Sequence, residues 1–200
     1  MTDTQPLDPS ELVIVLIGAS AVGKSTIAEY LSEAGIVQPT PTWATRPPRE
    51  GEKDTCYDHH FVSEEEFDCQ EEEGGFIDQH AFYGSRYGVP PLRKPLEGKE
   101  ALVVLKPVFM PVFKVHYPSV RIYQIEAARE KLAARMYNRG QSVEDINERM
   151  RLHSKEAEDA RRSADVTFTN NDSLEKTVKA VEAQIRKDRE AHDAKQLSAA

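Results

Sequence analysis

The sequence predicts an α/β fold, with a parallel sheet that carries helices on both faces. The first observation is a continuous apolar run at residues 12–17, LVIVLI, which ends at Gly18 and leads into a helix over 25–34. The second observation is that the later apolar runs alternate with helical stretches; these runs lie at 101–105, 120–125 and 166–168. Such alternation is typical of strands that are joined by crossover helices.

The segment 39–97 is expected to form an inserted subdomain. It is acidic between residues 50 and 78, which predicts a solvated surface. Ser63 and Glu66 are spaced as a capping box ahead of a short helix. Residues 76–90, FIDQHAFYGSRYGVP, mix aromatic side chains with glycines, so a twisted hairpin is expected there.

Two long helices are expected near the end of the chain. The one over 142–164 has a thin apolar stripe, which predicts weak docking and easy movement; the stripe consists of Ile146, Met150, His153, Ala157 and Ala160. The last helix is expected to open at Asp172, with Glu175 three residues later, as in a capping box. The polar, Ala-rich tail at 189–200 is expected to fray.

Charge and composition exclude several classes of function. With 26 Lys and Arg against 34 Asp and Glu, the net charge is -8, which argues against nonspecific binding to nucleic acid or to a membrane. The apolar run from Leu12 to Ala19 is too short to cross a bilayer. The two cysteines, Cys56 and Cys69, fit a reducing compartment, so a cytoplasmic protein is expected. Any anionic ligand therefore needs a local basic cluster.

The strongest functional signal is a phosphate loop, G-x-x-x-x-G-K-S, between the first predicted strand and helix. It consists of Gly18, Ala19, Ser20, Ala21, Val22, Gly23, Lys24 and Ser25, and Thr26 follows it. Glycines let backbone N–H groups surround phosphate oxygens, and the helix N-terminus adds its dipole. Lys24 is expected to reach the β and γ phosphates, and Ser25 to offer its hydroxyl to Mg²⁺. The loop predicts a nucleoside triphosphate site.

Two further groups of cations suit phosphate binding. Arg46 and Arg49, on a proline-stiffened turn, can bind one phosphate together, and the Tyr57 hydroxyl can complete that site. The second group would line a mobile helical segment, although surface ion pairing is the alternative interpretation. This second group is Arg135, Arg139 and Arg149.

These motifs together resemble guanylate kinase, a nucleoside monophosphate kinase of the P-loop family. Besides the phosphate loop, the resemblance rests on TRPPREGE, HHFVSEEEF, FIDQHAFYGSRYG, RMYNRGQ, INERM and NNDSLEKTV. It implies one domain with a five-stranded parallel core, an acceptor-binding insertion and a helical lid; their ranges would be 10–38, 98–134 and 163–188 for the core, 39–97 for the insertion and 135–162 for the lid. It also implies ATP, Mg²⁺ and a monophosphate acceptor, with GMP as the first candidate.

The resemblance assigns roles residue by residue. Phosphoryl transfer would depend on Lys24 and on the three lid arginines, Arg135, Arg139 and Arg149. The acceptor site would consist of Thr42, Arg46, Arg49, Tyr57, His59, Asp78, Tyr87 and Lys106. One inserted residue leaves open whether Tyr57 or His59 takes the place of the family's tyrosine. Arg139 and Asn171 would lie on the adenine side of ATP.

The base-reading positions depart from the family. Guanylate kinases read guanine with Ser, Glu and Asp, and the matching residues here are Thr42, Asp78 and Lys106; Val104 replaces a further aspartate. An ammonium accepts no hydrogen bond from the guanine N1–H or 2-amino group. We therefore expect Lys106 to turn away or to meet another group, such as a carbonyl or a second phosphate, and we expect GMP to be used poorly.

Two other functions stay open at the level of sequence. A kinase for another phosphorylated acceptor, such as ribose 1,5-bisphosphate, shares the strings NRG and NNDSL but lacks TRPPREGE. A non-catalytic guanylate-kinase-like binding module would keep the fold alone, and the intact Lys24 and Ser25 argue against it. The expected partners are small-molecule nucleotides, and neither nucleic acid nor a membrane is expected.

Overall fold

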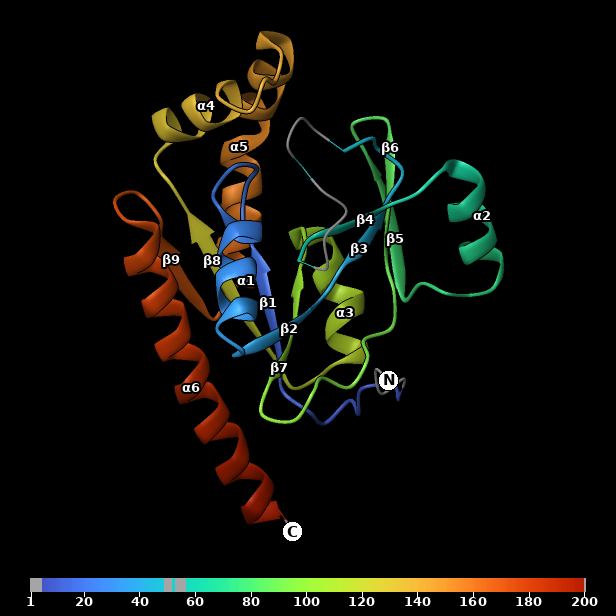
Figure 1. The fold of residues 1–200 in the computed structure, drawn as a ribbon, viewed down its shortest axis with the longest axis vertical. Helices are drawn as coiled ribbons and strands as arrows, with labels where there is room; N and C mark the ends of the chain where they lie inside the picture. The colour runs from blue at the N-terminus through green and yellow to red at the C-terminus, as the bar shows by residue number, and fades with distance from the viewer. Residues whose placement is uncertain (1–4, 49–51, 53–56, 200) are drawn as a thin grey trace.

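The computed structural model describes residues 5–48, 52 and 57–199. Its central sheet has five parallel strands in the order β2-β7-β1-β8-β9 (Figure 1). In that order the strands are Val37–Thr40, Glu100–Val104, Val13–Ile17, Val120–Glu126 and Val166–Thr169. β1 lies at the centre, with Val13 in register with Ala101 of β7 and Val120 of β8. The predicted α/β class and the parallel sheet are confirmed.

β2 is the strand that the apolar runs did not reveal. Its sequence is VQPT, and it pairs with β7 alone, at the edge of the sheet. Proline is tolerated in an edge strand because the missing N–H costs no ladder hydrogen bond. A short, half-buried edge strand therefore needs no continuous apolar run.

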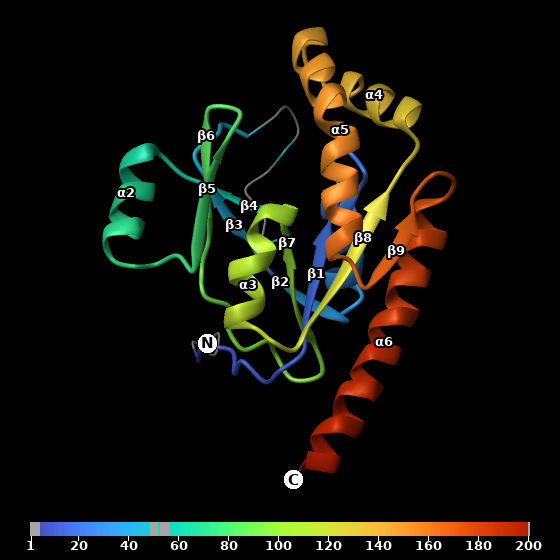
Figure 2. The same cartoon turned by 180° about the vertical axis from the view of Figure 1, so that it is seen from behind.

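Helices cover both faces of the central sheet (Figures 1 and 2). They include α1 (Lys24–Glu33), α3 (Met110–His116), α5 (Val143–Ser163) and α6 (Leu174–Ala199). Ile14 and Leu16 of β1 belong to the same apolar cluster as buried residues of α1 and α6. Val13, Val15 and Ile17 belong to a second cluster with buried residues of α3 and α5. Because successive side chains of a strand point to opposite faces, one apolar run supplies both cores.

A four-stranded sheet, in the order β4-β3-β6-β5, stands beside the central sheet. The strands are His59–Phe61, Thr42–Ala44, Ser85–Val89 and Asp78–Phe82, and helix α2 is Glu64–Glu72. β5 and β6 form the predicted hairpin, with Tyr83 (φ 52°) and Gly84 (φ 73°) left-handed at the turn. The capping box of α2 is confirmed: the Glu66 N–H donates to Ser63 Oγ, and the Ser63 N–H donates to the Glu66 carboxylate.

The start of α6 differs from the expected capping box by one residue. Ser173 caps the helix, because its Oγ accepts from the Lys176 N–H at 3.4 Å. The Ser173 carbonyl accepts from the Thr177 N–H at 3.2 Å. Asp172 therefore lies outside the helix.

The tail that is expected to fray is helical in the structure, where α6 continues to Ala199. Arg189 forms an ion pair with Glu100 at the start of β7 and donates to the Gly98 carbonyl at 3.1 Å. Further along, the Gln196 amide donates to the Ser10 carbonyl at 3.3 Å. Polar contacts to distant residues thus hold the end of α6 against the rest of the molecule. The sequence did not predict this packing because the segment has no apolar stripe.

α4 (Arg129–Tyr137) and the first turns of α5 rise above the carboxyl ends of the central strands (Figure 1). On α5 only Ile146, Met150 and Ala160 are buried, so the thin apolar stripe is confirmed. A short 3-10 turn, η1 (Pro107–Phe109), follows β7 and leads into α3. Within the described part of the chain, none of these helices combines the length and the apolar character needed to span a membrane.

Candidate active site

The loop between β1 and α1 has two positions that only glycine fits. Gly18 has φ 142°, and a Cβ there would lie 2.3 Å from the Ile125 carbonyl oxygen. Gly23 has φ 103°, and a Cβ there would lie 2.6 Å from the Asn170 side chain. Both positions combine left-handed backbone with close approach. The motif therefore has the tight backbone shape that exposes N–H groups to a phosphate.

Lys24, the first residue of α1, points back over the loop. Its Nζ donates to the carbonyl oxygens of Gly18 at 2.8 Å and Ala19 at 3.0 Å. Burial lowers the pKa of Lys24 to about 8, although the nearby carboxylate of Asp58 opposes this shift. A desolvated ammonium gains strongly when anionic oxygens approach it.

The loop forms one wall of a cavity that is completed by the second sheet, the end of β7 and helix α5. Among the described residues that line it, five are cationic and Asp58 is the one carboxylate. This balance favours a ligand with several negative charges. The lining residues are Gly18, Ser20, Ala21, Gly23, Lys24, Ser25, Thr26, Thr42, Arg46, Asp58, His59, Tyr83, Tyr87, Val104, Leu105, Lys106, Phe109, Arg139 and Arg149.

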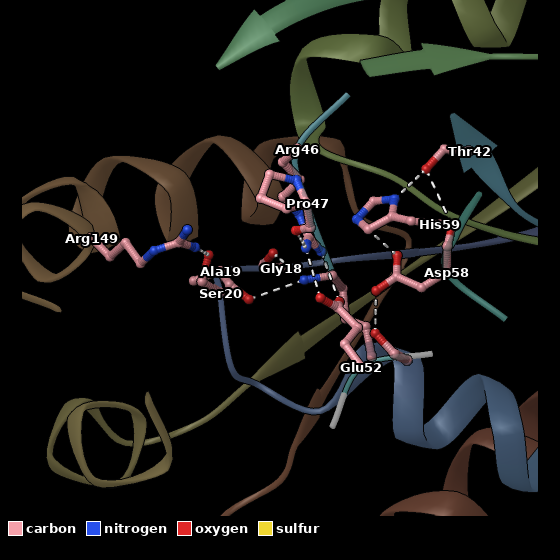
Figure 3. A network of polar contacts seen from close by, with 12 residues as sticks. Gly18, Ala19, Ser20, Thr42, Arg46, Pro47, Glu52, Asp58, His59 and Arg149 are labelled. Carbon is pink, nitrogen blue, oxygen red and sulfur yellow. Dashed lines mark hydrogen bonds and ion pairs between the residues drawn. The ribbon is translucent and has the colours of Figure 1, made fainter. Parts of the chain in front are cut away.

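Arg46, which follows β3, lines the cavity and is 8 % exposed. Its guanidinium donates two hydrogen bonds to Glu52, at 2.6 and 2.7 Å (Figure 3). The same group lies 4.8 Å from the centroid of the Phe61 ring. Arg46 Nε is buried and has no hydrogen-bond partner in the part of the chain that the structure describes. Arg49, its predicted companion, lies outside the described residues.

His59, not Tyr57, lines the cavity. His59 Nδ1 lies 2.7 Å from Thr42 Oγ1, and its ring centroid lies 5.6 Å from that of Tyr87. Tyr57 instead packs against the apolar cluster that includes α1. The structure thus brings Thr42, His59 and Tyr87 together at the cavity, whereas Tyr57 is not among the lining residues.

Asp78, a further predicted acceptor residue, does not line the cavity. It lies on β5, where its Oδ1 accepts from the Gln79 N–H at 2.9 Å. Its Oδ2 lies 3.3 Å from His80 Nε2. The predicted contact between Asp78 and a base is therefore not built into this arrangement.

Lys106 lines the cavity but is turned toward α5. Its Nζ donates to Glu156 of α5 at 3.1 Å and lies 5.0 Å from the centroid of the Tyr83 ring. Tyr83 also donates its hydroxyl to Glu156, at 3.1 Å. Lys106 meets another group, as expected, but that group is a carboxylate rather than a carbonyl or a phosphate.

Arg135 lies behind the phosphate loop rather than in the cavity. It donates to the carbonyl oxygens of Ala21 at 3.2 Å, Val22 at 3.3 Å and Asn170 at 2.9 Å. Burial, together with the nearby Arg139, lowers the pKa of Arg135. Three backbone acceptors thus hold the Arg135 guanidinium away from the cavity lining, and its role in phosphoryl transfer stays a prediction.

Arg139 and Arg149 do line the cavity, as predicted for lid residues. Arg149 Nη1 donates to Ser20 Oγ at 3.0 Å (Figure 3). Its guanidinium also lies 5.1 Å from the centroid of the Tyr83 ring. Helix α5 is thus joined to the phosphate loop by a cation that can be drawn toward a phosphate.

Asn171, predicted on the adenine side, does not line the cavity. Its Oδ1 accepts from the Ala128 N–H at 2.6 Å, so it fixes the entry to α4. The neighbouring Asn170 is buried, and its Nδ2 donates to the Val22 carbonyl at 2.9 Å. Asn170 was missed because the string NND gives no hint of which amide faces inward.

The sequence also gave no role to four lining or bridging residues: Asp58, Tyr83, Phe109 and Glu156. Asp58 resembled the rest of the acidic segment, and Glu156 is one of many charges on α5. Tyr83 could have been noticed, since a bulky residue before Gly84 in a hairpin marks a strained turn. The other three depend on contacts between distant segments.

The comparisons with a family model, with relatives and with a solved structure all point to one family. The model of the guanylate kinase family matches residues 10–188. A guanylate kinase of Syntrophus aciditrophicus (strain SB) is 31 % identical over 191 residues, 92 % of this chain and 91 % of that protein. One of Thermosynechococcus vestitus is 32 % identical over 192 residues, 92 % of this chain and 97 % of that protein. The crystal structure of guanylate kinase from Anaplasma phagocytophilum matches the fold, with TM-score 0.64 and 24 % identity over 90 % of this chain and 87 % of that chain.

Proposed function

The chain belongs to the guanylate kinase family, and from this premise we propose that it transfers the γ-phosphoryl group of ATP to GMP. Catalysis would depend on residues that line one cavity, with Lys24 on the phosphate-loop side and Arg46 on the acceptor side. One observation carries the proposal: the phosphate loop and the acceptor residues face the same space. Two phosphorylated substrates can therefore meet there.

The chain's own residues would act mainly by position and charge. Phosphoryl transfer places negative charge on the oxygens around phosphorus and needs little covalent help from the protein. Lys24 would exchange its two backbone acceptors for phosphate oxygens. Arg139 and Arg149 would bring further positive charge as the lid closes. No general base is required by this scheme.

The residues beside the loop fit a magnesium ion. Ser25 Oγ lines the cavity and lies within hydrogen-bond distance of a carboxylate oxygen of Asp58. Hydroxyl, carboxylate and phosphate oxygens are the ligands that Mg²⁺ prefers. When bound, Mg²⁺ would neutralise charge on the phosphates. Ser25 is the residue that we propose to hold it.

On the acceptor side, Arg46 would bind the monophosphate through its buried Nε, which faces no other described partner. Tyr87, His59 and Thr42 would complete that site, together with Arg49. Phe109 and Tyr83 give the same cavity aromatic surface. Such surface suits a planar base, with polar contacts to the phosphate fixing its position.

A second candidate is a kinase for another phosphorylated acceptor, such as ribose 1,5-bisphosphate. Lys106 favours it, because this cation lines the cavity at a position where guanine would present donors. Asp78 lies outside the lining, so the described residues show one carboxylate facing the cavity rather than two. A second phosphate would pair with Lys106 where a guanine edge would not.

We further propose the division into a core at 10–38, 98–134 and 163–188, an acceptor-binding insertion at 39–97 and a lid at 135–162. The cavity lies where these three parts meet, since each contributes lining residues. The thin apolar face of α5 would let the lid move during turnover. A cytoplasmic location is part of the same proposal, because it supplies ATP and reduced cysteines.

The direct experiment is a coupled assay of ADP formation from ATP and Mg²⁺, with GMP, AMP, CMP, UMP and ribose 1,5-bisphosphate compared as acceptors. GMP should give the highest kcat/KM of these acceptors, although a low one because Lys106 offers the guanine edge no acceptor, and Lys24→Ala should abolish the reaction. A higher kcat/KM for ribose 1,5-bisphosphate would favour the second candidate. Absence of ADP formation with every acceptor, in a folded protein that binds ATP, would favour the non-catalytic binding module.

A further inference from the structure

We propose that Asp58 supplies the carboxylate of the magnesium site beside the phosphate loop, so that the acceptor-binding insertion contributes directly to metal binding. The inference deepens the proposed function and rests on it. Asp58 lies 33 positions after Ser25 in the chain, yet Ser25 Oγ donates to Asp58 Oδ2. The hydroxyl and the carboxylate together offer a pair of hard oxygen ligands at the edge of the cavity.

The carboxylate is held in place from several directions. The carbonyl of Asp58 accepts from the Thr42 N–H at 2.9 Å, which fixes the backbone. Asp58 Oδ1 lies 3.4 Å from His59 Nε2, and His59 Nδ1 in turn lies 2.7 Å from Thr42 Oγ1. A metal ligand that is oriented by neighbouring side chains binds more tightly than a mobile one.

The described part of the chain offers no other carboxylate to this site. Asp58 is the only Asp or Glu among the described residues that line the cavity. The end of β7 and the residues after it, Val104, Leu105 and Lys106, provide apolar groups and a cation. Two nearby carboxylates are already paired, Glu52 with Arg46 and Glu156 with Lys106.

The position of Asp58 also has a consequence for the reaction. The residue directly precedes β4, and its neighbour His59 contacts the acceptor residues Thr42 and Tyr87. An acceptor that orders these residues would therefore order the carboxylate as well. Because binding free energies are reciprocal, the acceptor should tighten metal binding and the metal should tighten acceptor binding by the same factor.

A different role for Asp58 gives opposite results. If Asp58 only neutralises the buried ammonium of Lys24, its removal should leave metal affinity unchanged. It should also tighten ATP binding without metal, because a competing anion has been lost. Metal binding therefore separates the two roles.

The test compares Asp58→Asn with Asp68→Asn, which removes one exposed carboxylate from α2 of the same insertion. Mn²⁺ serves as the probe, and electron paramagnetic resonance measures its binding to the protein with ADP, with and without GMP. Asp58→Asn should weaken Mn²⁺ binding tenfold or more and should remove the tightening by GMP. Asp68→Asn should match the unmodified protein. Equal Mn²⁺ constants in all three proteins would overturn the proposal.

A second measurement needs no variant, so it stands even where Asp58→Asn fails to fold. The unmodified protein is labelled with ¹³C at aspartate side-chain carboxyl groups, and the Mn²⁺–ADP complex is examined by electron–nuclear double resonance. A ¹³C coupling to the metal is expected, and its absence would overturn the proposal. Neither readout requires phosphoryl transfer, so normal kinase activity with no Asp58 contribution would refute this inference and leave the proposed function standing. A protein that binds Mn²⁺–ADP through Asp58 without transferring phosphate would do the reverse.

Discussion

At the scale of single residues, Lys24 is a buried cation whose pKa is shifted by its surroundings. Its ammonium is buried, its pKa is lowered to about 8 by that burial, and it rests on two loop carbonyls. A charge kept in such a place costs stability until a ligand neutralises it. The arrangement suits a residue that serves the ligand rather than the fold.

Lys24→Ala is therefore expected to remove phosphoryl transfer, by a factor of 100 or more, with little effect on folding. Steady-state kinetics and thermal unfolding of the two proteins check both parts. Turnover similar to that of the unmodified protein would remove the phosphate loop from the proposed mechanism. A large fall in melting temperature would instead show that Lys24 supports the loop.

The pH dependence of ATP use should report the same ammonium. The folded, ligand-free protein loses this proton near pH 8, whereas the unfolded chain keeps it up to its ordinary pKa of 10.5. Because phosphates need the charged form, kcat/KM for ATP should fall as the pH rises through about 8. At saturating ATP the bound phosphates raise that pKa, so kcat should stay level to higher pH. A kcat/KM profile that is flat between pH 7 and 9.5 would contradict this assignment.

Arg46 and Arg49 are expected to act on the acceptor. Arg46→Ala or Arg49→Ala should raise the KM for the acceptor about tenfold or more, the loss expected for one charge-assisted contact of about 1.5 to 3 kcal/mol. The KM for ATP should change little. Arg86→Ala is the matched control, since Arg86 lies on the same small sheet but pairs with carboxylates of α2. Unchanged acceptor kinetics in both Arg46→Ala and Arg49→Ala would remove these arginines from the acceptor site.

At the scale of elements, α5 is attached to the rest of the site by polar contacts. Glu156 binds both Lys106 after β7 and Tyr83 of the β5–β6 turn, and Arg149 reaches Ser20 of the phosphate loop. Hydrogen bonds and ion pairs of this kind can be replaced by contacts to water or to a ligand more easily than the contacts of a packed apolar face. The position of Lys106 therefore depends on a carboxylate of α5.

Lys106→Asp should improve the use of GMP, because an anionic partner would then face the guanine N1–H and 2-amino group. The gain should appear mainly in kcat/KM for GMP relative to other monophosphates. Since the new carboxylate would also face Glu156, the double variant Lys106→Asp, Glu156→Gln should gain more, and Glu156→Gln alone is the control. Efficient GMP kinase activity in the unmodified protein that is lost on Lys106→Asp would refute a rewritten base site.

At the scale of the whole molecule, α6 is fastened across the central sheet by a buried polar cluster. The Tyr123 hydroxyl donates to Asp188 at 2.6 Å, and Arg121 lies 3.2 Å from the other carboxylate oxygen. Burial opposes ionisation, but the bonds from Tyr123, Gln184 and Arg121 hold the pKa of Asp188 below its usual value. The last helix is thereby joined to β8.

Asp188→Ala should lower the free energy of unfolding by about 1.5 to 3 kcal/mol, the usual value for hydrogen bonds to a charged group. Because the folded pKa is depressed, the contribution is present above the unfolded pKa of 3.8 and is lost as the pH falls through the lower folded value. Denaturant unfolding at pH 7 and at a series of pH values well below 3.8 measures both. Asp193→Ala, on the exposed part of the same helix, should have no effect. An equal loss at pH 7 and at the lowest pH values would show that packing, not charge, is what Asp188 supplies.

The sequence by itself determined the parts of this protein that depend on local order. The phosphate loop follows from the spacing of Gly18, Gly23 and Lys24, and the hairpin and the capping box of α2 follow from residues that are close neighbours in the chain. The central sheet follows from apolar runs whose periodicity is local. Family motifs then predicted that Arg46, Tyr87 and Lys106 line a common site with the loop, and all three line the cavity.

The tertiary structure alone decided which of two neighbouring residues faces the site and which distant charges meet. In the structure, His59 rather than Tyr57 lines the cavity. Arg135 binds backbone carbonyls of the loop instead of lining the cavity, and Ser25 donates a hydrogen bond to Asp58. The structure also places Glu156 beside Lys106, 50 positions away. The physical reason is that a side chain's direction in an irregular segment is set by packing against remote elements, and neither composition nor local periodicity carries that information.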